Sequence, residues 1–303
     1  MKTATHKHAG AAPVKGRVVA SFGRRYLVEL ADAAVLDCVT RGKRVDVACG
    51  DFVMARPSSP GEGVIEEIAP RASLLYRSDA HREKLIAANV TQIVIVAAAL
   101  PAFHESLINR CLAAAEHGGM AALIVLNKSD LAQAAAALER LQLYRRLGYE
   151  VLALAAKHDI APLRARLEHH TSVLVGQSGV GKSTIVNRLL PQAAARVGEL
   201  SAARGSGRHT TTHARLYHLD ATSHVIDSPG MQEFGLHHLS VAELAHAFVE
   251  FRPLLGRCRF RDCRHLREPD CAIAAACAAG EISARRLASY RELASEIERR
   301  RSK

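Results

Sequence analysis

Three short motifs in this chain are typical of a guanine-nucleotide site, but their order is unusual. Residues 127–130 read NKSD, residues 176–183 read GQSGVGKS and residues 227–230 read DSPG, which match the patterns NKxD, GxxxxGK[ST] and DxPG. A conventional GTPase carries the phosphate loop first, then DxxG, and NKxD last. A nucleotide pocket is a set of positions in space, so a chain whose ends have moved can still build it. The order therefore predicts a circularly permuted GTPase.

The phosphate loop at 176–183 is expected to hold the triphosphate and Mg²⁺. The apolar, β-branched residues 171–175 predict a buried strand before it, and residues 182–190 predict a helix that opens directly after it. Backbone N–H groups at a helix start bind phosphate oxygens, Lys182 would reach the β- and γ-phosphates, and Ser183 would bind Mg²⁺. A glycine-rich turn with a chance Lys-Ser is the alternative. The residues assigned to the nucleotide are Gly176, Ser178, Gly179, Val180, Gly181, Lys182, Ser183 and Thr184.

The NKSD motif is expected to select guanine. The Asp130 carboxylate can accept two hydrogen bonds from the guanine edge that adenine cannot donate, while Asn127 would hold the loop and Lys128 completes the contacts to the nucleotide. Residues 121–126 predict a strand that ends at this motif, and ligands bind at the carboxyl edge of open α/β sheets. A helix-capping turn at Asp130 is the alternative.

The DSPG motif and the segment before it are expected to sense the γ-phosphate. Asp227 would hold Mg²⁺ through water, and the Gly230 N–H would meet the γ-phosphate; taken alone, the motif could be a simple turn. Residues 205–212 read GSGRHTTT and lie between the two phosphate motifs. One threonine there, which we assign as Thr211, could bind Mg²⁺ and order a switch only in the GTP state. A flexible linker is the alternative.

The residue that orients the attacking water does not follow from the conventional pattern. A conventional GTPase often has glutamine directly after DxxG, but Met231 stands there and cannot polarise water. We assign His209 as the catalytic candidate beside Lys182, with Gln232 as an alternative. An exposed loop histidine without a catalytic role is the other interpretation of His209.

The composition indicates a cytoplasmic protein with a polyanionic partner. The 303-residue chain carries a formal net charge of +11, no tryptophan and only 4% aromatic residues. Such a charge favours nucleic acid or an anionic membrane surface, and few aromatics argue for phosphate contacts over extensive base stacking. No apolar run reaches the ~18 residues of a membrane span, and the first ten residues lack a secretory apolar segment. We expect no membrane association and a monomer.

Four of the seven cysteines lie near the end of the chain and predict a metal site. Cys258, Cys263, His265 and Cys271 offer three sulfurs and one imidazole within fourteen positions, a ligand set that zinc takes in closed structural sites. Cys277 is spare and could replace His265. Six nearby arginines make this loop a candidate phosphate binder; they are Arg252, Arg257, Arg259, Arg261, Arg264 and Arg267.

The pattern of elements predicts three domains. Residues 1–82 contain short strands at close spacing, which favour an OB-fold barrel that binds RNA, with another small barrel as the alternative. Residues 83–240 alternate strands and helices, as expected for the permuted GTPase domain with a mainly parallel sheet. Residues 241–303 predict a mainly helical zinc-binding domain. The fold class is thus multidomain: an OB-fold β-barrel, a permuted α/β P-loop GTPase and a helical zinc domain.

The whole chain resembles the ribosome small-subunit-dependent GTPase A family, known as RsgA or YjeQ. The matching pieces are the 14–77 barrel, NKSD, GQSGVGKS, GRHTTT at 207–212, DSPGMQEFGL at 227–236 and the Cys258/Cys263/His265/Cys271 cluster. This resemblance implies GTP and GDP as substrate and product, Mg²⁺ and one structural zinc. It also implies a GTPase that acts late in small-subunit assembly, binds ribosomal RNA near the decoding region, and is released by hydrolysis. It places a proposed catalytic switch histidine at His209.

Two departures from the family pattern lie in the loop expected to line the guanine. Ala155 stands where the family usually has serine, and the glycine-containing turn that usually follows reads His158-Asp159-Ile160-Ala161 here.

Three rival functions are weighed against the resemblance: a nucleotide-gated RNA-binding protein with incidental hydrolysis, a permuted GTPase of the large subunit, and a P-loop kinase. The barrel with the cysteine cluster disfavours the second, and NKSD disfavours the third.

Overall fold

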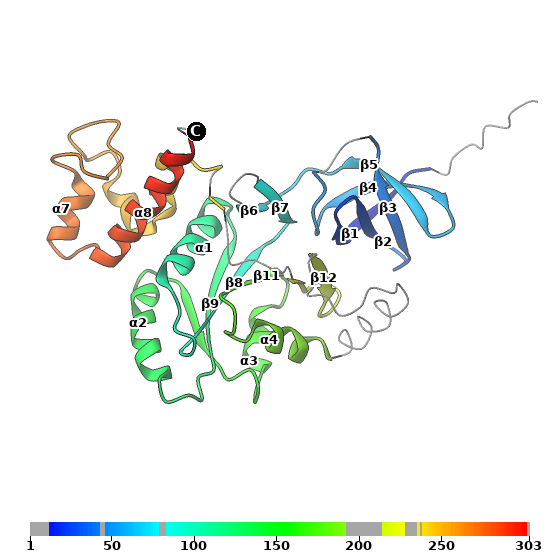
Figure 1. The fold of residues 1–303 in the computed structure, drawn as a ribbon, viewed down its shortest axis with the longest axis horizontal. Coiled ribbons are helices and arrows are strands. Elements are labelled where there is room, and N and C mark those ends of the chain that lie inside the picture. The colour runs from blue at the N-terminus through cyan, green and yellow to red at the C-terminus, as the bar shows by residue number, and fades with distance from the viewer. Residues whose placement is uncertain are drawn as a thin grey trace, which may run out of the picture.

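The computed structural model describes residues 12–42, 46–78, 83–191, 214–227, 235–236 and 238–301. Figure 1 shows a small barrel at one end of the molecule, a sheet with its helices in the middle, and the C-terminal helices α7 and α8 at the other end. Across these ranges, no helix combines the length and the apolar character that a membrane crossing requires. The predicted multidomain architecture is confirmed.

Five strands close the N-terminal barrel. They are β1 (Val14–Phe22), β2 (Arg25–Leu30), β3 (Val35–Thr40), β4 (Phe52–Ser59) and β5 (Glu62–Ile68). The order is β1-β2-β3-β5-β4, and β4 returns to pair with β1; β3 and β5 are parallel and the other pairs antiparallel. The sequence of β3 gives a weak strand signal, because Val35 and Val39 are exposed while Leu36 and Cys38 are buried. Apolar residues on both faces hide the alternation that identifies a strand.

The central sheet is parallel except at one edge. Its strands are β8 (Gln92–Ala98), β9 (Ala121–Asn127), β10 (Glu150–Ala153), β11 (Thr171–Val175), β12 (Arg215–His218) and β13 (His224–Asp227). The order is β10-β9-β8-β11-β13-β12, and β12 runs antiparallel to β13. The NKSD strand β9 therefore lies two places from the phosphate-loop strand β11 although it precedes it in the chain. This arrangement is the predicted permutation in spatial form.

Helices cover both faces of this sheet. They are α1 (Glu105–His117), α2 (Ala134–Arg146), α3 (Ala161–Arg166) and α4 (Lys182–Leu189). Ile93 and Ile95 of β8 belong to the hydrophobic core that includes α1 and α2, whereas Val94 and Val96 belong to the core that includes α3 and α4. A strand buried on both sides has a continuous apolar sequence, which explains the QIVIV pattern of β8.

The C-terminal region shares its core with the central domain. It contains α6 (Val241–Ala247), the 3-10 helix η1 (Val249–Leu254), α7 (Ala272–Ala278) and α8 (Ala284–Arg301). Phe248, Phe251 and Tyr290 lie in the same buried cluster as Ile108 of α1 and Ile93 of β8. The barrel instead has a core of its own. We therefore expect the C-terminal region to move with α1, and the barrel to be the more independent body.

The barrel joins the central sheet through the antiparallel pairing of β1 with β12, a few polar contacts and a hairpin. The hairpin, β6 (Leu74–Ser78) with β7 (Glu83–Ala88), forms a separate antiparallel sheet. The Arg17 guanidinium donates to the Thr171 hydroxyl over 2.9 Å, and His218 Nε2 lies 2.7 Å from the Glu29 carboxylate. The domain boundaries at 82 and 240 stay a prediction.

A buried arginine fastens α8 to α1. Arg286 is 1% exposed and donates to both Glu250 oxygens over 2.6 and 3.1 Å and to Asn109 Oδ1 over 2.6 Å. Its guanidinium also lies 4.2 Å from the centre of the Phe248 ring. A buried charge is tolerated only when it is paired and hydrogen-bonded, and here the partners come from η1 with its N-cap and from α1.

Changing Arg286 to methionine is expected to destabilise the protein by about 3–5 kcal/mol, because Glu250 would stay buried without its cation. Arg285→Met is the matched control. Arg285 is exposed and pairs with Glu105 over 2.8 Å, and such surface pairs contribute about 1 kcal/mol or less. Urea unfolding of both variants measures the difference. An equal loss of unfolding free energy in the two variants would contradict a stabilising role for the buried Arg286 ion pair.

Candidate nucleotide and metal sites

The phosphate loop turns from β11 into α4 at two glycines that admit no side chain. A Cβ on Gly176 would lie 2.3 Å from the Val96 carbonyl oxygen, because β8 passes directly beside the loop. Gly181 has a φ of +102°, and its Cβ would lie 2.3 Å from Asn127 Nδ2. These contacts fix the loop at the start of α4, where Ser183 and Thr184 occupy the first helical turn. Backbone N–H groups at such a position can bind phosphate oxygens.

Lys182 lies inside the loop that precedes it. Its ammonium donates to the Gly176 and Gln177 carbonyl oxygens over 2.6 and 2.7 Å. Burial lowers the pKa of Lys182, and the nearby Asp227 carboxylate opposes that shift. Burial likewise raises the pKa of Asp227, and Lys182 opposes it. The two charged groups therefore face the same half-buried space, which can receive phosphate oxygens and a divalent cation.

Asn127 braces the phosphate loop against the loop expected to line the base. Its Nδ2 donates to the Val180 carbonyl oxygen over 2.9 Å, and its Oδ1 accepts from the Ala156 N–H over 3.0 Å. The side chain is 3% exposed, so both bonds are shielded from water. NKSD and the phosphate loop are thus held in one unit although 45 residues lie between them in the chain.

Lys128 makes a second connection between NKSD and the phosphate loop, whereas Asp130 lies at the exposed edge of the site. Lys128 has a φ of +59° and its ammonium donates to the Leu100 and Gly179 carbonyl oxygens over 2.6 and 2.7 Å. The Asp130 side chain is 44% exposed and lies 3.9 Å from His158 Nε2. Its carboxylate is open to a ligand, as recognition of a guanine edge requires.

Several residues that the motifs do not identify also support the site, mainly through hydrogen bonds of their backbone groups. The Gln177, Leu100 and Ala156 peptide groups hold the site lysines and Asn127. Arg188 of α4 donates to the His158 carbonyl oxygen over 3.0 Å and supports the base loop from behind. A motif defined by residue types cannot identify a backbone group. Arg188 is different, because its position one helical turn beyond Thr184 could have predicted a supporting role for its side chain.

Part of the assigned site lies outside the described residues. His209, Thr211 and Gly230 are in this class, together with the alternative Gln232 and with Met231, which stands at the usual glutamine position. Their roles stay predictions. Asn127, Lys128, Asp130, the 176–184 residues and Asp227 are the assigned nucleotide residues that the structure brings to one edge of the sheet.

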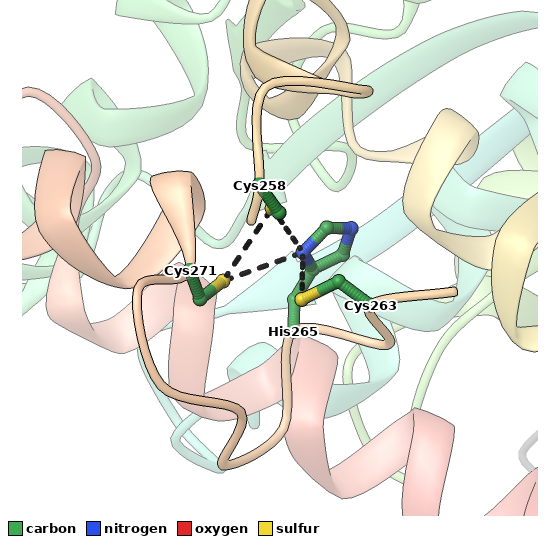
Figure 2. A group of neighbouring side chains, drawn as sticks. All are labelled: Cys258, Cys263, His265 and Cys271. Carbon is green, nitrogen blue, oxygen red and sulfur yellow. Dashed lines mark hydrogen bonds between the residues drawn. The ribbon is translucent and has the colours of Figure 1, made fainter. Parts of the chain in front are cut away.

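The four zinc candidates converge in a single cluster. Figure 2 shows three cysteine sulfurs around Nδ1 of His265. The distances from Nδ1 to Cys258, Cys263 and Cys271 Sγ are 3.5, 3.5 and 3.4 Å, and Cys258 and Cys271 Sγ are 4.0 Å apart. Tetrahedral zinc bonds of ~2.3 Å to sulfur and ~2.0 Å to nitrogen would separate these atoms by roughly 3.5 and 3.8 Å. The cluster therefore fits a zinc ion.

Neighbouring elements hold this cluster in place. His265 is 5% exposed and has a φ of +61°. Tyr290 and Arg291 of α8 donate to the Arg264 and His265 carbonyl oxygens over 2.7 and 3.3 Å. The Ala272 N–H donates to Cys258 Sγ over 3.4 Å, as expected for a ligand that carries negative charge. Cys277 lies on α7, outside the group of four ligand atoms.

Comparison with known proteins places this geometry in a family. Residues 68–237 match the family model described as RsgA GTPase. The small ribosomal subunit biogenesis GTPases RsgA of Nitrosospira multiformis and Nitrosomonas europaea are 53% and 51% identical to the chain. The alignments cover 94% and 92% of this chain and 91% and 90% of those proteins. The chain belongs to the RsgA GTPase family.

Solved structures extend this likeness to the whole fold. YjeQ from Thermotoga maritima has a TM-score of 0.71 and 29% identity, over 94% of this chain and 98% of that one. YloQ, described as a circularly permuted GTPase, has a TM-score of 0.70 and 28% identity, over 98% and 99%. The resemblance to the RsgA family that the motifs indicated is therefore confirmed, and the circularly permuted fold is confirmed as well.

The replacement of serine by Ala155 leaves the brace of the base loop intact. The Ala156 N–H bonds Asn127, and the Ser129 N–H donates to the Leu154 carbonyl oxygen over 3.1 Å. In the following turn, Asp159 Oδ1 accepts from the Ala161 N–H over 2.8 Å and so replaces the expected glycine turn. Backbone hydrogen bonds therefore hold this loop of the RsgA family member at both departures.

Proposed function

We propose that this protein is a GTPase that binds the small ribosomal subunit late in its assembly and is released after hydrolysis. The observation that carries the proposal is the joint position of Lys182, Asp227 and NKSD at one sheet edge, in a chain about half identical to small-subunit biogenesis GTPases. The protein would act as a cytoplasmic monomer on ribosomal RNA. The barrel, the arginine-rich zinc loop and the net charge of +11 support an RNA partner.

The chemistry is in-line attack of water on the γ-phosphate. The loop N–H groups and Lys182 would position the triphosphate and stabilise the charge that develops on its oxygens. Ser183 and Asp227 would hold Mg²⁺, which supplies further neutralisation of phosphate charge. Thr211 and Gly230 would contact the γ-phosphate side, and His209 would orient the water. We expect slow intrinsic turnover, because Met231 occupies the usual glutamine position, and the ribosome would complete the site.

Hydrolysis by the purified protein, alone and with small or large subunits, tests this proposal. We expect strong stimulation of GTP hydrolysis by small subunits, little by large subunits, and no hydrolysis of ATP. The matched control is Lys182→Ala with small subunits, which should remove the stimulated rate. Stimulation by large subunits instead would contradict the proposal.

A further inference from the structure

The arginines around the zinc cluster divide into two groups in the structure. Arg252, Arg259 and Arg264 form ion pairs with Glu116, Asp270 and Glu298. Arg257, Arg261 and Arg267 have no side-chain ion pair or hydrogen bond with any described residue. The first group holds the loop, and the second is available to a polyanion.

An exposed aromatic ring lies among these arginines. Phe260 is 41% exposed and takes no part in the hydrophobic core of the described residues. It lies between the ligands Cys258 and Cys263, and the Arg259 guanidinium is 5.6 Å from the centre of its ring. The Cys263 N–H donates to the Phe260 carbonyl oxygen over 3.3 Å, so the turn is fixed. An exposed aromatic ring on a turn that is fixed at both sides offers a stacking platform for a base.

A cavity of about 240 Å³ opens beside this ring, between α6 and the zinc loop. Its lining includes Phe260, Arg261, Asp262, Arg264, His246 and Leu255, together with the zinc candidates Cys258, Cys263 and His265. Sites for drug-sized molecules are about 300–1,000 Å³, so this cavity is sized for one flat ring system. Arg261 in its lining favours a phosphate nearby, and the Asp262 carboxylate can accept hydrogen bonds from an amino group.

We propose that this cavity receives one unstacked base of an RNA, which stacks on Phe260 while Arg261 contacts its phosphate. RNA is read mostly at single-stranded positions whose bases stack on aromatic side chains, and phosphates are bound by arginine. Three arginines without a partner among the described residues, beside one exposed ring, favour a polyanion that also carries aromatic bases, which is RNA. This inference rests on the proposed function and adds the place and chemistry of one RNA contact.

Affinity for purified small subunits, measured with a non-hydrolysable GTP analogue, tests the contact. Phe260→Ala is expected to lower affinity about tenfold, because stacking on an aromatic side chain contributes that order of binding. Phe260→Leu should lose as much, and Phe260→Tyr should retain most of it. Unchanged zinc content and melting temperature would show that each variant is folded.

Salt dependence separates stacking from phosphate binding. Arg261→Ala should reduce the slope of log affinity against log salt by about 0.7, the value for one contact to a single strand. Phe260→Ala should leave that slope unchanged. Chemical probing of the subunit RNA should also show one base protected by the wild-type protein and reactive with Phe260→Ala.

The outcomes separate this inference from the proposed function. Wild-type binding that Phe260→Ala leaves intact would overturn the base contact alone. A loss of binding without any base that changes reactivity would point to a ribosomal protein at this surface and also overturn it. A wild-type protein that fails to bind small subunits would overturn both.

Discussion

Replacing Asp130 with asparagine is expected to weaken GTP binding by about 100-fold or more and to create binding of xanthosine triphosphate. Guanine presents N1–H and a 2-amino group, both donors, and the carboxylate presents only acceptors. Hydrogen bonds to charged groups contribute about 1.5–3 kcal/mol each. Asparagine removes one of the two, makes the other neutral and sets its N–H₂ against the guanine amino group, which together correspond to roughly 100-fold or more. Xanthine has a carbonyl in place of the amino group, and the asparagine N–H₂ can donate to it.

The structure indicates that this change stays local. Asp130 is at the rim, while the brace below it is made by Asn127 and by the Ser129 N–H. Asp159→Asn is the matched control, because Asp159 lies on the neighbouring loop and its carboxylate caps the Ala161 N–H instead of facing a ligand. Titration with fluorescent guanine and xanthine nucleotides measures both variants. Retained GTP affinity in Asp130→Asn, or an equal loss in Asp159→Asn, would remove the assignment.

Much of the fold was predictable because it is encoded in local patterns. The strands of the central sheet are continuous apolar runs, since helices bury them on both faces, and the nucleotide motifs stand at their carboxyl ends. The elements that were missed have weak local signals. β12 has four residues, including Arg215 and His218, and α3 has six residues with a proline near its start. Pairing with β13 and burial of Leu163 stabilise them, and both are tertiary effects.

In the candidate sites, too, some features could be predicted from local sequence and others could not. Residue types identified the phosphate loop, NKSD and the four zinc candidates, because each type supplies a specific charge or ligand atom. The structure was needed to show that Asn127 connects two loops, and that only three of six nearby arginines lack a partner among the described residues. Such facts depend on distances between segments far apart in the chain. No local pattern contains them.

Contacts of the segment that follows Asp227 connect the nucleotide site to the barrel and to the zinc region, which are the two candidate RNA-binding regions. Asp227 ends β13, and the first described residues after it are already anchored: the Gly235 N–H donates to the Tyr76 carbonyl oxygen over 3.1 Å. The His238 ring lies 4.9 Å from the Tyr76 ring and 5.6 Å from the His117 ring. Tyr76 belongs to the hairpin that leads from the barrel, and His117 ends α1. One short segment therefore contacts both the barrel hairpin and the helix to which the zinc region is docked.

Removing zinc is expected to unfold the loop from about 257 to 271 while leaving nucleotide binding intact. Structural zinc contributes about 10–16 kcal/mol to the folding of small zinc modules, a large quantity beside the stability of a domain. The four ligand atoms lie within 4.8 Å of one another, and His265 is buried. Without a cation these groups have no comparable attraction to hold them.

Cys271→Ser and Cys277→Ser provide a matched pair for this prediction. Cys271 supplies a ligand sulfur and directly precedes α7, whereas Cys277 lies near the end of α7 outside the cluster. We expect one zinc per chain in the wild type and in Cys277→Ser, and strongly reduced zinc in Cys271→Ser. Mass spectrometry of the metal content and amide hydrogen exchange over the loop measure both. Loss of zinc from Cys277→Ser would mean that Cys277 is a ligand.

The unfolding is expected to stop at α6, because its own contacts do not depend on the cluster. Ser240 and Glu243 form a reciprocal cap at its start, and Arg286 is held by Glu250 and Asn109 without any zinc candidate. Fluorescent GTP should therefore bind the zinc-free protein with nearly wild-type affinity, while binding to small subunits falls. If GTP affinity falls as well, the shared core transmits the damage to α1 and the nucleotide loops, and the zinc region is part of the GTPase fold itself.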